Sequence, residues 1–168
     1  NITGNNLEFG GDAKLTIDNS LTLDLTLNPD FSQVEVDQQV TNLSRYEVSL
    51  PEKRQFFIEN SDLFSGFGDK RDANPFFSRR IGIAKDLDGN SIQNKISGGL
   101  KLSGKINSDF RIGVLNMQTE EDLDNEIAAT NNAIIALQHK VFNRSNISFM
   151  FINRQATKDY EFLGEDEE

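Results

Sequence analysis

The chain has 168 residues and a formal net charge of −10, which suffices for one domain with a buried core and argues against a nucleic-acid binder with a basic face. It has no cysteine and a single histidine, His139, so disulfide frameworks, thiolate metal sites and Ser/His/Asp catalysis are poorly supported. No run of about 18 apolar residues occurs, which excludes a transmembrane helix but leaves strands of about 10 alternating residues open.

Residues 13–28 predict a β-hairpin. Leu15 and Ile17 alternate with polar residues, a tight turn is expected at 18–20, and Pro29 ends the second strand. The second strand carries four leucines in strict alternation with polar residues, namely Leu21, Leu23, Leu25 and Leu27. This pattern gives the strand one apolar face and one polar face.

Residues 29–95 predict a long irregular insertion between strands, in which phenylalanines are mixed with arginines and carboxylates. Such a segment fits either a constriction inside a barrel, with arginines facing a polar solute, or a plug whose charges pair with one another around a small phenylalanine core. The self-paired plug would join Arg54, Arg79 and Arg80 to Glu52, Glu59 and Asp62. The candidate lumen or plug residues of the insertion are Arg54, Phe56, Phe57, Glu59, Asp62, Phe76, Phe77, Arg79 and Arg80.

Residues 96–156 predict two more hairpins, and residues 157–168 an acidic tail at which a longer protein is expected to have been cut. The first of these hairpins places Ile96, Leu100 and Leu102 on one face. In the second, residues 119–141 also match helical spacing, but the alternation that follows the turn at 143–146 favours a strand from about residue 131.

Short and long connections alternate along the chain, as they do in an up-and-down outer-membrane barrel with short turns at one end and long loops at the other. We therefore predict an all-β fold of antiparallel hairpins forming part of an outer-membrane β-barrel. The alternative is a soluble β-sandwich, which also alternates apolar and polar residues. In the barrel the inward positions would be Thr22, Asp24, Thr26, Lys101, Ser103, Arg111, Ser148 and Arg154; the outward positions would be Leu21, Leu23, Leu25, Leu27, Phe110, Ile112, Phe149 and Phe151.

Other candidate sites are weak. Asp86, Asp88 and Asn90 place oxygen atoms at alternate positions before a turn, as a calcium loop does, but the later bidentate glutamate is missing, so a polar turn is the competing interpretation. The carboxylates at residues 30–37 follow a strand-ending proline and suit a polar connection better than a hydrolase site. No catalytic residue is predicted.

Several blocks of the sequence together resemble the large outer-membrane proteins of Bacteroidota in which a domain of unknown function follows a family-9-like carbohydrate-binding module. The blocks lie at residues 21–35, 51–64, 77–82, 98–104, 112–116 and 146–154. The resemblance implies a membrane β-barrel domain, with the carbohydrate-binding module before residue 1 and further strands beyond this chain. It supplies no catalytic residues.

These observations lead to one functional expectation with alternatives. The chain is expected to be a non-enzymatic outer-membrane segment that contacts lipid and binds or passes a polar solute; a saccharide is implied by the resemblance alone. The alternatives are a plugged structural barrel in an assembly with other outer-membrane proteins, or a soluble binding module.

Overall fold

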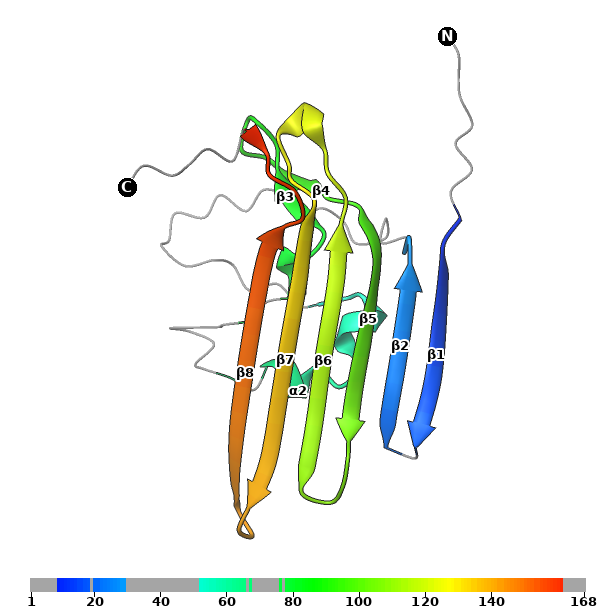
Figure 1. The fold of residues 1–168 in the computed structure, drawn as a ribbon, viewed down its shortest axis with the longest axis vertical. Helices are drawn as coiled ribbons and strands as arrows, with labels where there is room; N and C mark the ends of the chain where they lie inside the picture. The colour runs from blue at the N-terminus through cyan, green and yellow to red at the C-terminus, as the bar shows by residue number, and fades with distance from the viewer. Residues whose placement is uncertain are drawn as a thin grey trace, which may run out of the picture.

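The computed structural model describes residues 9–18, 20–29, 52–65, 67, 76 and 78–161. The main feature is a six-stranded antiparallel sheet in the order β1-β2-β5-β6-β7-β8 (Figure 1). The strands are β1 (Gly11–Asp18), β2 (Leu21–Leu27), β5 (Ile96–Lys105), β6 (Phe110–Thr119), β7 (Thr130–Val141) and β8 (Ser145–Ala156). The predicted all-β class is confirmed, and the sheet is open.

The three predicted hairpins are β1–β2, β5–β6 and β7–β8. Residues 130–141 form a strand, so the strand interpretation is confirmed over the helical one for this segment. The acidic connection before it contains one short 3-10 turn, η2 (Leu123–Asn125), which Asp122 caps by accepting a hydrogen bond from the Asn125 amide. Every described strand of the main sheet therefore neighbours the next one along the chain, as in an up-and-down arrangement.

The long insertion has more regular structure than its mixed sequence indicates. Its described part contains two single-turn helices, α1 (Gln55–Ile58) and α2 (Asp62–Ser65), and a 3-10 turn, η1 (Ser78–Arg80). A small hairpin of β3 (Ile83–Lys85) and β4 (Ser91–Gln93) then leads into β5. In Figure 1 the helices lie behind the main sheet.

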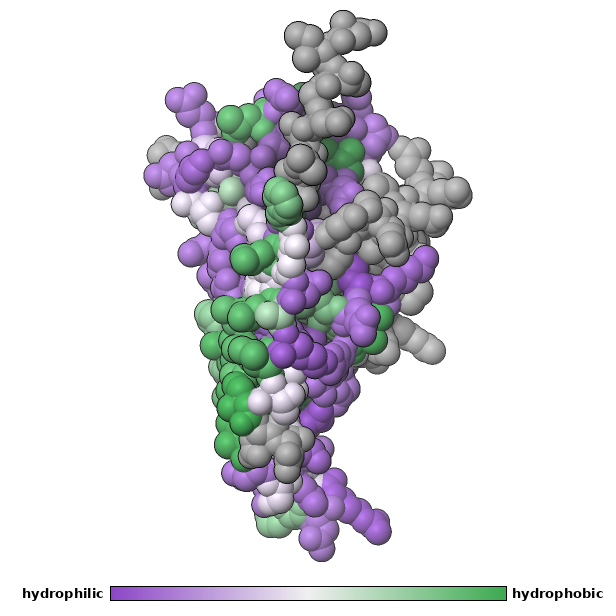
Figure 2. All heavy atoms as spheres, turned by 90° about the vertical axis from the view of Figure 1, so that its right-hand side faces the viewer, coloured by the Kyte–Doolittle hydropathy of each residue, from purple (hydrophilic) through white to green (hydrophobic). Residues whose placement is uncertain are grey.

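The two faces of the main sheet differ in the charged residues they carry. Residues can be assigned to a face because opposite residues in each antiparallel pair lie on the same face. The pairing Lys14–Asp24–Lys101–Leu115 runs across one face, here called the inner face; the pairing Leu15–Leu23–Leu102–Val114 runs across the other, the outer face. By the same registers all eight predicted inward positions share the inner face and all eight outward positions share the outer face. In the side view of Figure 2, hydrophobic residues gather along one side of the lower half and hydrophilic residues along the opposite side.

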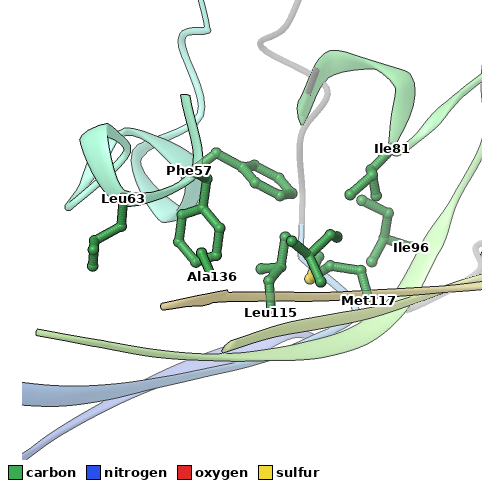
Figure 3. Packing of buried hydrophobic residues seen from close by; sticks show 9 residues of the cluster. Phe57, Leu63, Ile81, Ile96, Leu115, Met117 and Ala136 are labelled. Atoms are coloured by element: carbon green, nitrogen blue, oxygen red, sulfur yellow. The ribbon is translucent and has the colours of Figure 1, made fainter. Parts of the chain in front are cut away.

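The hydrophobic core lies between the insertion and the inner face, as the close view in Figure 3 shows. The insertion contributes Phe57, Leu63, Phe64 and Ile81, and the strands contribute Ile96, Leu115, Met117, Ile134 and Ala136. Burying a large apolar side chain stabilises a fold by about 1.5–3 kcal/mol. The aromatic and aliphatic residues of α1 and α2 therefore hold the insertion on the sheet.

The predicted face of one residue, Ile96, is wrong. A β-bulge between Ile96 and Gly98 adds one residue to β5, so Ile96 turns to the opposite face from Leu100 and Leu102. Ile96 is buried in the core, and its partner across the pair is Thr119. A residue that strict alternation places on the outer face thus helps to bind the insertion.

The outer face remains exposed. Leu27, Ile147, Phe149 and Phe151 are at least half exposed, and among the described residues no second sheet covers them. A β-sandwich needs such a covering sheet. No helix in the described part of the chain is both long and apolar enough to cross a membrane.

Candidate functional site

The predicted candidates from the strands and from the insertion meet where α1 and α2 cover the inner face. Asp24, Lys101 and Arg111 reach this contact from the sheet. Glu59 and Asp62 reach it from the insertion. The site is therefore a charged contact between two segments far apart in the sequence, bordered by the hydrophobic core.

Lys101 lies at the centre of this contact and is 1 % exposed. Its ammonium group donates to the backbone carbonyls of Phe56 and Glu59 at the end of α1, the second at 3.1 Å. It lies 3.6 Å from Asp24 Oδ2 and 5.1 Å from the centre of the Phe56 ring. A buried ammonium needs several partners to be tolerated, and here most of them come from the insertion.

Two ion pairs flank Lys101 at the border of the contact. Glu59 binds Lys14 of β1, which also lies 3.8 Å from Asp24, and Asp62 lies 2.7 Å from Arg111 of β6. The side chains of Glu59 and Asp62 are 41 % and 64 % exposed, so solvent reaches both pairs. Exposed pairs of this kind contribute about 0–1 kcal/mol each, which is less than one buried phenylalanine. These ion pairs therefore orient the insertion on the sheet but contribute less than the buried phenylalanines to the stability of its docking.

The expected pairing of the insertion with itself is seen at Arg54. Arg54 is 6 % exposed and binds both carboxylate oxygens of Glu52 at 2.8 Å. It also donates to the carbonyls of Ser78 and Ile81, and its guanidinium lies 4.2 Å from the centre of the Phe57 ring. Arg54 thus joins residues 52–54 of the insertion to residues 78–81, whereas Glu59 and Asp62 pair with the sheet.

Acidification is expected to loosen this junction. Burial by itself raises the pKa of Glu52. The hydrogen bonds and charge of Arg54, together with the Ser78 hydroxyl, lower this pKa by more than burial raises it, so the net pKa lies below the ordinary value of 4.5. The stabilisation is therefore present above about pH 4.5 and is lost as the pH falls through the lower pKa of the folded state. Hydrogen exchange of residues 52–65, corrected for the intrinsic pH dependence, should accelerate below pH 4.5.

Substitution of Glu52 by glutamine should make this acid dependence shallower, because the titrating group is gone. Glu161→Gln, at an exposed glutamate outside the insertion, serves as the matched control and should behave as the unmodified protein does. An unchanged acid profile in Glu52→Gln would show that other carboxylates hold the junction.

Phe64 packs where the sheet has no side chain. A Cβ atom placed on Gly113 would lie 2.7 Å from Phe64 Cζ and 3.0 Å from Cε1. Glycine at this position of β6 thus allows the ring to lie directly on the backbone. Nearby, the Asn60 amide donates to the Ser103 hydroxyl at 3.0 Å, which aligns the insertion with β5.

Three buried polar atoms of the described residues have no hydrogen-bond partner, and all lie on the inner face: Asp24 Oδ2, Thr26 Oγ1 and Arg111 Nε. Asp24 Oδ2 nevertheless lies 3.6 Å from the Lys101 ammonium group, so its charge is paired.

Other predicted residues lie outside this contact. Arg154 is exposed near the end of β8, Arg80 is exposed in η1, and Phe76 packs against Phe64 with ring centres 6.0 Å apart. Phe77 and the side chain of Arg79 are outside the described residues, as are the carboxylates at 30–37 and residues 162–168.

The weak calcium candidate forms the turn between β3 and β4. Asp86 Oδ1 accepts hydrogen bonds from the amides of Asp88 and Asn90, and Oδ2 accepts one from the Asn90 side chain. These bonds, led by the Asn90 side chain, lower the pKa of Asp86. The carboxylate thus caps its own turn. No group of three or more acidic or histidine side chains within the described ranges is arranged to hold a metal ion.

Sequence reasoning did not select Lys14, Asn60 or Gly113 as site residues. Alternation does place Lys14 on the polar face of the first strand, which was the one available signal. Asn60 and Gly113 carry no such signal, because their roles depend on how the insertion docks.

The fold and the site together define an antiparallel β-sheet protein with one apolar face and one charged face, the charged face covered by a long insertion. The chain belongs to a family described as Domain of unknown function (DUF5916), whose profile matches residues 1–162. No curated protein and no solved structure matches the chain.

Proposed function

We propose that this chain forms part of the wall of a non-enzymatic outer-membrane β-barrel that binds or passes a polar solute, with the outer face toward lipid and the inner face toward the lumen. The observation that carries the proposal is the open apolar outer face of the sheet. A soluble sheet covers its apolar face, whereas here the insertion covers the inner face, which mixes charged residues with apolar core residues, and the uncharged outer face is open.

Charge placement supports lipid contact. By the strand registers, no outer-face residue whose side chain the structure describes is a lysine, arginine, aspartate or glutamate. Asparagine and glutamine follow the apolar stretch at one end, where Asn116 and Asn131 exchange side-chain hydrogen bonds. The outer-face residues of β7 from Ala133 to Val141, apolar except for His139, extend over about 26 Å at about 3.3 Å per residue. Barrel walls carry an apolar band of about 25 Å between polar borders.

The two edge strands of the sheet, β1 and β8, are consistent with its being part of a larger closed barrel. Among the described residues, β1 pairs only with β2 and β8 only with β7, although β8 has 12 residues. Strand edges are not stable within lipid unless they are paired. Closure would therefore use strands outside the described residues, as the resemblance to longer Bacteroidota proteins implies. A saccharide as solute rests on that resemblance alone.

Single-tryptophan reporters test the lipid-facing assignment, because the chain contains no tryptophan. Phe149→Trp places the reporter on the outer face, and Ser148→Trp places it at the adjacent position on the inner face. In liposomes, brominated lipid should quench the fluorescence of the Phe149→Trp variant strongly and that of the Ser148→Trp variant weakly. Equal quenching in the two variants would refute the membrane wall, and so would a protein that stays soluble without detergent.

A second candidate is a plugged structural wall that docks other outer-membrane proteins. The observation that favours it is the burial of Lys101 beneath α1, which closes the inner face at this point. The two candidates differ in solute uptake by liposomes: an open pore admits solute with the insertion in place, whereas a plugged wall admits solute only after the insertion is displaced.

A further inference from the structure

The inner face is strongly basic, although the whole chain has a net charge of −10. The strand registers place six basic and two acidic residues on this face. The basic residues are Lys14, Lys101, Lys105, Arg111, Lys140 and Arg154, and the acidic residues are Asp12 and Asp24. This face has more cations than it can pair within the sheet.

Two of these cations bind carboxylates that the insertion supplies. Glu59 binds Lys14, and Asp62 lies 2.7 Å from Arg111. The direct neighbours of Arg111 across the strands are Lys105 and Gln138, neither of which is acidic. The pairing of Arg111 with a carboxylate therefore depends on the insertion.

We propose that the inner face binds a linear solute carrying several carboxylates, and that Glu59 and Asp62 occupy its carboxylate positions as an intramolecular substitute. The inference rests on the proposed function, because it takes the inner face as the solute-lining surface. The two pairs are partly exposed, so a dissolved carboxylate can replace Glu59 or Asp62 while the buried phenylalanines keep the insertion in place.

The distance between Lys14 and Arg111 indicates that a ligand contacting both must be extended. Lys14 and Arg111 are separated by three strand spacings across the sheet and by four residues along β6. With strands about 4.8 Å apart and about 3.3 Å per residue, their Cα atoms lie about 20 Å from each other. A single small anion cannot bridge them, whereas a chain with repeated carboxylates can reach both by passing over the part of the insertion that buries Lys101 and Ser103 between them.

The test is a calorimetric titration of the protein in detergent with tetragalacturonate, which has a carboxylate on each sugar ring, and with neutral maltotetraose. Tetragalacturonate should bind and maltotetraose should not. Glu59→Gln/Asp62→Asn should tighten tetragalacturonate binding about tenfold, because the fraction of free sites rises when the internal competitor is removed. Lys14→Gln/Arg111→Gln should weaken it at least about tenfold.

The matched control removes two charges from the same face at other positions. Lys105→Gln/Lys140→Gln should change tetragalacturonate binding by less than about threefold if the positions of Lys14 and Arg111 matter. An equal loss in both double variants would overturn the inference in favour of nonspecific attraction. Equal binding of the neutral sugar, or no tightening in Glu59→Gln/Asp62→Asn, would also overturn it.

These outcomes are distinguishable from failure of the proposed function. Calorimetry in detergent reports on the inner face whether or not the outer face contacts lipid, and quenching at position 149 reports on lipid contact whether or not anions bind. Normal quenching without tetragalacturonate binding would reject the solute assignment alone.

Discussion

Replacement of Gly113 by valine is expected to displace the helical part of the insertion from the sheet. The first added carbon would lie 2.7 Å from the Phe64 ring, and valine adds two methyl groups beyond it. Because Phe64 is only 4 % exposed, the ring has no room to move aside within the core. Overpacking of this kind costs about 1–3 kcal/mol. Hydrogen exchange of residues 55–65 should become roughly five- to a hundredfold faster, since about 1.4 kcal/mol corresponds to tenfold.

The β6 strand itself should not weaken, because valine favours strands more than glycine does. Amide protection of β6 in Gly113→Val therefore serves as an internal control. Gly113→Val/Phe64→Ala should recover part of the docking, since it removes the ring that collides. Gly11→Val, at a strand glycine where an added Cβ meets no atom within 4 Å, is the matched control. If Gly113→Val left residues 55–65 protected, Phe64 would not be packed on that glycine.

The same variant separates the two candidate functions. If the insertion closes the lumen, liposomes containing Gly113→Val should swell faster in a polar solute than liposomes containing the unmodified protein. Equal swelling, with exchange of residues 55–65 accelerated, would reject the plugged wall in favour of a pore that is open beside the insertion.

Lys101→Met is expected to be the most destabilising single substitution among the charged residues of the contact. It removes the donor to the Phe56 and Glu59 carbonyls and leaves Asp24, 9 % exposed, without its buried cation. Removing one partner of a buried pair costs about 3–5 kcal/mol. The free energy of unfolding, measured by urea titration in detergent, should fall by about that amount.

Double substitution shows whether the loss arises from the unpaired carboxylate. Lys101→Met/Asp24→Leu should be more stable than Lys101→Met, because a buried pair replaced by apolar residues is often neutral or stabilising. Lys105→Met changes an exposed lysine of the same strand and face, so it should alter stability by less than about 0.5 kcal/mol. Strict additivity of the Lys101 and Asp24 effects would mean that the two side chains do not interact.

The sequence by itself determined the hairpins and the two faces of the sheet. Alternation with period two is a local property, and antiparallel pairing carries it from strand to strand, so Asp24, Lys101 and Arg111 could be assigned to one face without a structure. The strand at 130–141 was also recoverable, because the turn after it and the strand that follows allow a hairpin.

Only the tertiary structure decided how the insertion is used. Whether Glu59 and Asp62 pair within the insertion or with Lys14 and Arg111 depends on contacts across 45 or more residues, for which no local pattern exists. The bulge that turns Ile96 inward has the same cause, because one extra residue reverses the facing of a strand without altering its composition. Local periodicity therefore assigned residues to faces, while docking of the insertion determined which face it covers and which charges it pairs.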